Sequence, residues 1–382
     1  MTVKVYFDHN ASSSLAPEVK ELLRDFNDVC FGNPSSIHGA GQEARKILNT
    51  SRDQLARLLN CEEEEIIFTS GGTESINTAI LGLAELASGE KREIISSPIE
   101  HYATLRSLEY LKSKGFAVHF LKIDRQGRFR LEELREKLSE KTFLVSLMWA
   151  HNEIGNLYPV REVAKLCQEK GTLFHCDGVQ AAGKLKIDLR AFPIDLLSLS
   201  AHKFHGPQGV GLLYLRRGVK ISPLHWGGKQ ERALRGGTPN LSGIYGMAKA
   251  LEICVKNMEE SVAHLLKLRQ KLEEGILSKI DGVELNGDPE NRLCNTSNFT
   301  VKGVDGESLL FNLDLQGVAA SAGAACESGS IDPSHVLLTL GRSVREAKAS
   351  LRLSLSKYNT EKEIDFVLEI LPKIVERIRR RN

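Results

Sequence analysis

The sequence predicts an α/β protein with a mostly parallel, seven-stranded sheet in a large domain and a smaller α+β domain. Three observations lead to this fold class. Apolar segments of strand length alternate with helical segments over the first two thirds of the chain, which is typical of a parallel sheet covered on both faces. Two later segments alternate apolar and polar residues with period two, which indicates a half-exposed antiparallel sheet. The length of 382 residues is enough for about two domains.

Each predicted strand of the large sheet is one apolar segment. The seven segments are residues 64–70, 92–98, 117–123, 141–150, 171–177, 194–201 and 209–216. Helices are predicted over residues 73–86 and 102–115, and the second ends at a glycine. The glycine-rich residues 227–237 are predicted to form a loop.

A second domain is predicted from the C-terminal third of the chain. An unusually long helix from about residue 241 to residue 277 is expected to join the domains, and residues 297–303 and 350–358 supply the period-two strands. We therefore place the large domain at residues 15–255 and the small domain at residues 1–14 and 256–382.

Composition excludes several classes of protein. The 51 basic and 49 acidic residues nearly balance, so no nucleic-acid-binding surface is expected. No apolar run approaches the roughly 18 residues of a membrane span, and the N-terminus lacks an apolar signal core, so we expect a cytoplasmic protein. The seven cysteines contain no CxxC pair, which argues against a disulfide framework and against a four-cysteine zinc site.

Polar side chains follow several of the predicted strands, where parallel sheets bind their ligands. The first set is residues 70–75, SGGTES. Gly72 would allow a phosphate to approach the start of a helix, and Thr73 adds a hydroxyl. The alternative is an ordinary strand-to-helix turn capped by Ser70 or Thr73.

Two further strand ends carry Asp177 and Lys203. A buried carboxylate is costly unless it is paired, and a protonated pyridine nitrogen would pair with Asp177. A lysine at the mouth of a sheet can have a lowered pKa, which suits Schiff-base formation. For Asp177, the alternative is a salt bridge or a helix cap. For Lys203, the alternative is a side chain that reaches the surface, although Ser200 and His202 beside it favour a ligand-binding site.

His101 follows another strand, and its imidazole could stack on a flat ring and move protons. A structural histidine is the alternative. Asn152 and Glu153 follow the strand that ends at Ala150. Together these sets supply a phosphate cradle, a carboxylate, a Schiff-base lysine and a stacking histidine, a combination that describes pyridoxal phosphate and few other ligands.

At this point the sequence resembles the NifS/IscS-like cysteine desulfurases of the class V aminotransferase family. The resemblance covers nearly the whole chain, and its motifs are highly specific in combination. They are YFDHNAS (6–12), FGNPSSIH (31–38), TSGGTES (69–75), EH (100–101), AHNEIGN (150–156), HCDGVQAAGK (175–184), SAHKFHGPQGVG (200–211), GGKQERALRGGTPN (227–240), SAGAACESGSIDPSHVL (321–337) and LRLSLSKY (351–358).

The resemblance implies a fold-type I enzyme with pyridoxal phosphate bound to Lys203 as a Schiff base. Asp177 should pair with the pyridine nitrogen and His101 should stack on the ring. Gln180 and Asn152 should lie near the ring hydroxyl. The phosphate should be held by Gly72, Thr73, Ser200 and His202. The resemblance also implies a homodimer, in which Thr238 contacts the phosphate bound by the partner subunit.

The same resemblance implies the substrate and the sulfur path. Arg352 should bind the carboxylate of L-cysteine, with Asn33 nearby. Cys326 should take the sulfur as a persulfide and release L-alanine, with Lys203 and His101 moving protons. Sulfur-acceptor proteins, such as an iron–sulfur scaffold, are the expected partners.

Local patterns support two of these roles. Leucines 351, 353 and 355 face one side of a strand, so Arg352 lies on the other side, where it could hold a carboxylate in two-pronged fashion. The alternative is a surface arginine. The neighbours of Cys326 are small and polar, unlike those of most inert buried cysteines. A cysteine in an arbitrary loop is the alternative.

Three residues depart from the family pattern without touching an assigned role: His9, His151 and Gln208. Two rival functions stay open at this point. An aminotransferase or selenocysteine lyase would keep the cofactor set without needing Cys326. A non-catalytic sulfur carrier would keep only the fold.

Overall fold

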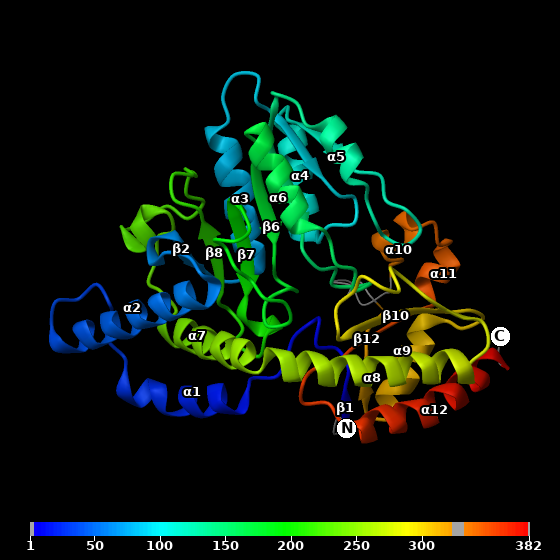
Figure 1. Cartoon of the computed structure of the whole chain (residues 1–382). Coiled ribbons are helices and arrows are strands. Elements are labelled where there is room, and N and C mark those ends of the chain that lie inside the picture. Colours follow the sequence, from blue (N-terminus) through cyan, green and yellow to red (C-terminus); the bar gives the residue numbers. More distant parts are fainter. Residues whose placement is uncertain (1–3, 323–331, 381–382) are drawn as a thin grey trace.

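A seven-stranded sheet forms the centre of the computed structural model, which describes residues 4–322 and 332–380 (Figure 1). The strand order is β2-β8-β7-β6-β5-β3-β4, and β8 pairs antiparallel with both neighbours while the other pairs are parallel. The strands are β2 (Ile66–Thr69), β3 (Glu93–Ser96), β4 (Ala117–Phe120), β5 (Thr142–Met148), β6 (Leu173–Asp177), β7 (Leu196–Ser200) and β8 (Gly211–Leu215). The predicted mostly parallel, seven-stranded sheet is confirmed.

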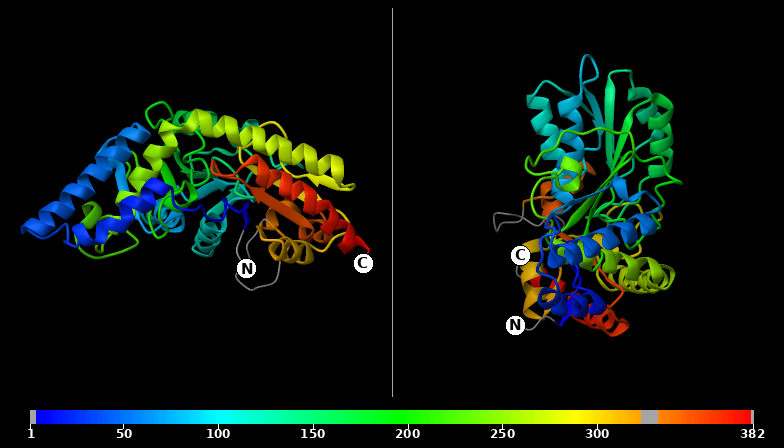
Figure 2. Two further views of the ribbon diagram at one scale, coloured as in Figure 1. Left: turned by 90° about the horizontal axis from the view of Figure 1, so that it is seen from below. Right: turned by 90° about the vertical axis from the view of Figure 1, so that its left-hand side faces the viewer.

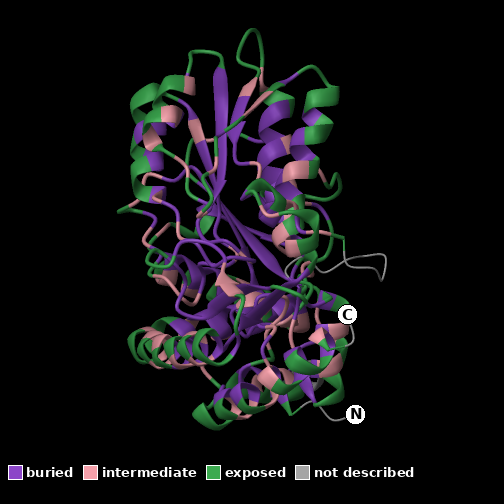
Figure 3. Cartoon of the chain, turned by 90° about the vertical axis from the view of Figure 1, so that its right-hand side faces the viewer, coloured by how far each residue is buried: buried purple, intermediate pink, exposed green. Residues whose placement is uncertain are grey.

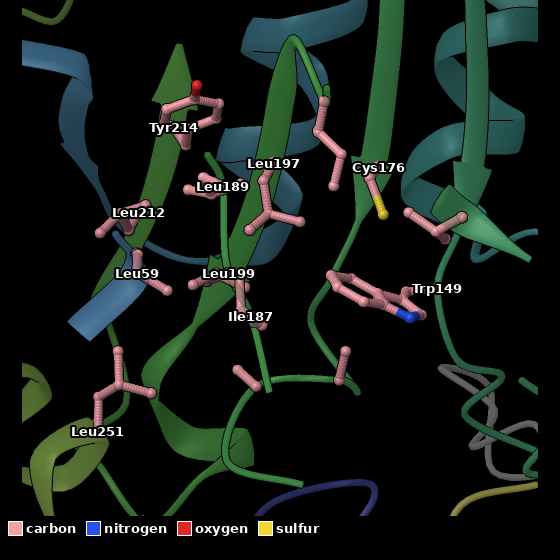
Figure 4. Packing of buried hydrophobic residues seen from close by; sticks show 14 of the residues in the cluster. Leu59, Trp149, Cys176, Ile187, Leu189, Leu197, Leu199, Leu212, Tyr214 and Leu251 are labelled. Carbon is pink, nitrogen blue, oxygen red and sulfur yellow. The ribbon is translucent and has the colours of Figure 1, made fainter. Parts of the chain in front are cut away.

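Helices cover both faces of this sheet, because the strands have apolar side chains on both faces. Successive residues of β3 point to opposite sides, so Ile94 packs with the side chains of α3 and α4, and Ile95 packs in a second cluster with α2, α6 and α7. Figure 4 shows part of that second cluster, where Leu197 lies between Leu212 of the neighbouring strand and Trp149 in this view. Figure 3 shows the strands buried and the outer helix faces exposed.

The helices have the following bounds. They are α1 (Pro17–Val29), α2 (Gly39–Leu59), α3 (Gly72–Leu86), α4 (Tyr102–Ser113), α5 (Leu131–Lys137), α6 (Val160–Lys170), α7 (Leu241–Lys256), α8 (Met258–Lys279), α9 (Gly306–Leu315), α10 (His335–Thr339), α11 (Val344–Lys348) and α12 (Glu361–Arg379). Within the described ranges, every helix is too short or too polar to cross a lipid bilayer.

The prediction of one helix over residues 241–277 is wrong, because α7 and α8 are separate helices. Asn257 between them leaves the helical conformation, with φ −108° and ψ 19°. The two helices bury different surfaces: α7 packs in a core cluster of the large sheet, whereas α8 packs in the C-terminal core. They follow one another nearly end to end (Figures 1 and 2). The predicted domain boundary at residues 255 and 256 falls beside this break and stays a prediction.

A three-stranded antiparallel sheet, β12-β10-β9, forms the centre of the C-terminal part. Its strands are β9 (Val283–Leu285), β10 (Thr296–Val301) and β12 (Ser350–Ser354). The antiparallel pairing is confirmed, but the expected half-exposure is wrong, since every residue of β10 and β12 is buried. The leucine face packs against α8 and α12, while polar residues of the other face contact the loop after β5, as Asn298 does through the carbonyl of Glu153.

The N-terminal segment connects the two parts of the molecule. Strand β1 (Val5–Tyr6) pairs in parallel with β11 (Val318–Ala319). Beyond β1, the backbone N–H of His9 donates to the carbonyl of Ser354 in β12, and that of Ser13 donates to the carbonyl of His202 after β7. Residues 8–13 therefore lie between the small sheet and the carboxyl ends of the large one.

Candidate active site

A cavity of about 360 Å³ lies at the carboxyl ends of β5, β6 and β7, where Arg352 of β12 also reaches it. Parallel strands end at the same edge of a sheet, so residues distant in sequence meet there. The structure brings ten of the predicted site residues to this cavity: Gly72, Thr73, His101, Asn152, Asp177, Gln180, Ser200, His202, Lys203 and Arg352.

Lys203 lies in the short turn that follows β7. Its Nζ donates hydrogen bonds to the carbonyl oxygens of Asn10, at 2.7 Å, and Ala11, at 2.8 Å. Burial, together with the nearby cations Arg352 and Lys184, lowers the pKa of Lys203 to about 8. An amine with such a pKa is partly neutral at physiological pH, which is the form that attacks a carbonyl group.

Asp177 is the last residue of β6 and is buried. One carboxylate oxygen, Oδ1, accepts a hydrogen bond from the backbone N–H of Val179 at 2.9 Å. Burial raises the pKa of Asp177 to about 6, while that hydrogen bond and Lys203 oppose the shift. A cationic group in the cavity would stabilise the charged carboxylate.

The start of α3 borders the same cavity. No side chain caps this helix end, so backbone N–H groups of its first turn can bind an anion. A Cβ atom on Gly72 would lie 2.9 Å from Cγ2 of Val179, so a larger residue would crowd the approach. Ser200 is the last residue of β7 and His202 lies in the turn after it, and burial lowers the pKa of His202 to about 4.

His101 is the residue that caps α4. Its Nδ1 accepts a hydrogen bond from the backbone N–H of Ala103 at 3.0 Å, so the neutral ring carries its proton on Nε2. The ring is reachable from the cavity, yet the surrounding protein lowers the pKa of His101, first by removing water and then through Lys203. His101 is therefore a neutral hydrogen-bond donor near pH 7.

Arg352 is a buried residue of β12, so the surface alternative for this residue is wrong. Its Nη2 lies 2.6 Å from Oδ1 of Asp8, and its Nη1 donates to the carbonyl of Asn152 at 3.2 Å. The sequence reasoning assigned no role to Asp8. Only its place in the YFDHNAS motif could have drawn attention to it.

Asn10 was missed in the same way, although it joins several site residues. Its carbonyl accepts from Nε2 of Gln180 at 3.0 Å as well as from Lys203. Its Nδ2 donates to the carbonyl of Asn152 at 3.0 Å and to Oγ1 of Thr296 at 2.8 Å. Asn10 thus connects the lysine and the small sheet in one hydrogen-bonded network.

Two predicted residues do not line the cavity of the single chain. Thr238 borders a smaller hollow beside Ser70. Asn33 is exposed, and its Oδ1 accepts from the backbone N–H of Ser35 at 2.9 Å. Neither residue contacts the predicted site within one chain.

Cys326 lies outside the described residues. Two described residues, one on each side of it in the sequence, are held next to the cavity. Ser321 exchanges backbone hydrogen bonds with Arg352, and Oγ of Ser334 donates to Oε2 of Glu153 at 2.6 Å. Glu153 itself lines the cavity.

Two further cavity residues had no assigned role. Glu100 is buried, its Oε1 accepts from the backbone N–H of Met148 at 3.0 Å, and burial raises its pKa well above the ordinary value. His335 lines the cavity from α10. Glu100 could have been found as the partner of His101 in the EH motif, whereas His335 gave no signal beyond its place in a long motif.

The chain is similar to known proteins over nearly its whole length. Residues 5–367 match the family described as Aminotransferase class-V. A protein named cysteine desulfurase IscS from Clostridium botulinum is 45% identical over 381 residues, 99% of this chain and 96% of the relative. Another of that name from Methanosarcina thermophila is 46% identical over 375 residues, 98% of this chain and 93% of the relative. A solved structure described as a NifS-like protein has a TM-score of 0.92 and 41% identity, covering 97% of this chain and 99% of the other.

Proposed function

Because the chain belongs to the class-V aminotransferase family and is a pyridoxal-phosphate-dependent cysteine desulfurase, we propose that L-cysteine loses its sulfur in the cavity at the strand ends. The observation that carries this assignment is the meeting of Lys203, Asp177 and Arg352 in one cavity. Lys203 can react with an aldehyde, Asp177 can pair with a protonated ring nitrogen, and Arg352 can bind a carboxylate. The architecture is that of fold-type I enzymes.

The residues present fit pyridoxal phosphate. The uncapped start of α3, with Gly72, Thr73, Ser200 and His202 around it, would hold the phosphate. Asp177 would hold the ring nitrogen, Gln180 and Asn152 would lie near the ring hydroxyl, and His101 would lie against the ring. When bound, the cofactor supplies an aldehyde for the amino group of Lys203 and a ring that withdraws electrons from the substrate.

Side chains of the protein bind the substrate and transfer its protons. Arg352 binds the substrate carboxylate while Asp8 holds its Nη2. Lys203, once its Nζ is free, moves the α-proton. His101 donates from Nε2–H.

Cys326 is the sulfur acceptor in this proposal. Its thiolate attacks the substrate sulfur, an S–S bond forms as the C–S bond breaks, and the electron pair of the C–S bond goes to the carbon that becomes the methyl group of L-alanine. Incubating the holoenzyme with L-cysteine should yield L-alanine and protein persulfide in equal amounts in the first turnover. Alanine without persulfide would support a lyase with no protein acceptor, and pyruvate or a transferred amino group would support an aminotransferase.

Asp177→Asn is expected to weaken pyridoxal phosphate binding and to reduce turnover by about 100-fold or more, since a buried charge pair with the ring nitrogen is lost. The amide keeps the shape of the side chain and can still accept from Val179. Cofactor titration by visible absorbance and alanine release by the saturated enzyme measure the two effects.

Asp195→Asn is the matched control, because Asp195 has the same 6% exposure but binds Arg216 and the backbone of Phe174 away from the cavity. The control should bind the cofactor normally as long as it stays folded. Equal cofactor affinity in the Asp177→Asn variant and the wild type would remove Asp177 from the site.

We also propose that the active form is a homodimer in which Thr238 of each subunit completes the phosphate site of the other. Both Thr238 and Asn33 lie outside the cavity of one chain, and large apolar side chains near them are exposed, as Phe31 is at 85%, Ile37 at 87% and Trp226 at 80%. Sedimentation analysis should show a dimer at micromolar concentration, and Thr238→Ala should release the cofactor about tenfold more readily. A fully active monomer would contradict the proposal.

The sulfur taken from L-cysteine needs an acceptor beyond this enzyme. Relatives that carry the name cysteine desulfurase IscS support delivery to iron–sulfur cluster assembly through an acceptor protein, and we propose that this takes place in the cytoplasm. We expect the persulfide on Cys326 to be the donor.

A further inference from the structure

Glu153 is a carboxylate of the cavity that the steps above do not use. It follows β5, and only 3% of the residue is exposed. Its backbone is fixed at both polar groups, because its N–H donates to Nδ1 of His151 at 3.0 Å and its carbonyl accepts from Nδ2 of Asn298 at 3.3 Å. Its Oε2 accepts from Oγ of Ser334 at 2.6 Å. The side chain is therefore held in place where the residue borders the cavity.

The second oxygen of this carboxylate has no partner of its own. Within residues 4–322 and 332–380, Oε1 of Glu153 makes no hydrogen bond and is not among the fully buried polar atoms. No lysine or arginine in these ranges forms an ion pair with Glu153. Its negative charge acts on the nearby imidazole of His101, where it opposes the lowering of the pKa. Glu153 thus adds negative charge to the cavity without a paired cation.

The imidazoles around Glu153 do not neutralise it. His101 and His151 are neutral near pH 7, because burial lowers the pKa of both, and that of His151 to about 3. Nε2 of His335 lies 3.2 Å from the carbonyl oxygen of Glu100, and since a carbonyl only accepts, this nitrogen carries a proton and is bound there. None of the three rings lies within ion-pair distance of the Glu153 carboxylate.

A substrate held by Arg352 lies beside Glu153. Nη1 of Arg352 donates to the carbonyl of Asn152 at 3.2 Å, and Asn152 directly precedes Glu153. Lys203 borders the same cavity of about 360 Å³, so a substrate that contacts both Arg352 and the cofactor has little room away from Glu153. The thiol of L-cysteine, with a pKa near 8.5, is mostly uncharged at pH 7, whereas the side chain of L-aspartate is an anion there.

We propose that Glu153 is a specificity residue that repels amino acids with a negatively charged side chain and admits the neutral thiol of L-cysteine. This role rests on the proposed function of the cavity and adds the class of substrate that it rejects. Like charges repel strongly in a site with little water, and Glu153 has no paired cation to weaken the repulsion. Every amino acid presents its α-carboxylate to Arg352, so the discrimination falls on the side chain.

L-asparagine and L-aspartate test the role, because they differ in charge and hardly in shape. Their binding to the holoenzyme is measured at pH 7 from the change in cofactor absorbance, for the wild type, Glu153→Gln and Glu93→Gln. The amide in Glu153→Gln can still accept from Ser334. Glu93→Gln is the matched control, because Glu93 also accepts from a serine hydroxyl, that of Ser139 at 2.8 Å, but lies at the start of β3, away from the cavity.

The wild type and the control should bind L-asparagine about 30-fold more tightly than L-aspartate, and this ratio should fall to about threefold or less in Glu153→Gln. A ratio near one in the wild type, or a ratio that Glu153→Gln leaves unchanged, overturns the proposal. Alanine release from L-cysteine by the wild type is measured in parallel. If no alanine appears, the proposed function is refuted, while a 30-fold ratio that depends on Glu153 would still identify it as the group that rejects anions.

Discussion

Lys203→Ala is expected to abolish alanine release and the visible absorption band of the bound cofactor. The Nζ of this residue is the amine of the cavity that can react with an aldehyde, and no neighbouring hydroxyl or imidazole forms the same bond. Pyridoxal phosphate should still bind through its phosphate and ring nitrogen, but weakly and reversibly. Absorbance of the variant after gel filtration, together with an alanine assay, measures both losses.

Lys184→Met is the control for this experiment. Burial also lowers the pKa of Lys184 to about 8, but its Nζ donates to the carbonyl of Gln180 and does not line the cavity. This variant should keep the absorption band. An absorption band that persists in Lys203→Ala and disappears in Lys184→Met would show that the cofactor is bound to Lys184 and not to Lys203. That result would refute the site.

The pH dependence of cofactor uptake follows from the lowered pKa of Lys203. A neutral amine is the reactive form, so uptake by the cofactor-free enzyme should speed up as the pH rises through about 8 and then level off. At pH 7 about a tenth of such amines are neutral, against about one in 2500 for an ordinary lysine with a pKa near 10.4. A rate that still climbs steeply above pH 9 would show that the cavity does not lower the pKa.

Cys326→Ser is expected to leave cofactor and L-cysteine binding intact while reducing persulfide and alanine formation by at least about 1000-fold. Binding depends on Lys203, the phosphate cradle and Arg352, which lie on regular elements or directly after them. Sulfur transfer needs a thiolate, and a serine hydroxyl is far harder to ionise near neutral pH. Mixing the variant with L-cysteine should change the cofactor spectrum without releasing product.

The other cysteines make poor substitutes for Cys326. Burial raises the thiol pKa of the five described cysteines for which a shift is resolved, and the value for Cys61 is about 12. Cys61→Ser is therefore the matched control and should form persulfide at the wild-type rate. Alanine release at the wild-type rate by Cys326→Ser would show that the enzyme needs no protein sulfur acceptor.

Much of the cavity could be predicted because its residues follow strands. A carboxylate or lysine directly after an apolar segment has a known place, at the edge where parallel strands end, so Asp177 and Lys203 were found without any knowledge of their contacts. The burial of Arg352 was harder to predict from the sequence. Its strand alternates like a half-exposed one, and the cover on its polar face comes from a loop about 200 residues earlier in the chain.

The errors have a similar cause. Residues 241–277 have the composition of one helix, but α7 and α8 pack on different cores and separate at Asn257. Helix propensity depends on the local sequence and does not show which core a helix face will pack against. One continuous helix was therefore predicted where packing separates two. Helix ends depend on such contacts more than on the residues at the end.

The sequence by itself determined the fold class, the family, the cofactor set and the strand ends that carry it, because these depend on local periodicity and on motifs of neighbouring residues. Only the tertiary structure decided that Asn10 holds Lys203, that Asp8 holds Arg352 and that Glu100 sets the tautomer of His335. Those contacts join residues 193, 344 and 235 positions apart. No periodicity connects residues at such distances, so the hydrogen bonds that assign each proton exist only once the two sheets have packed around the cavity.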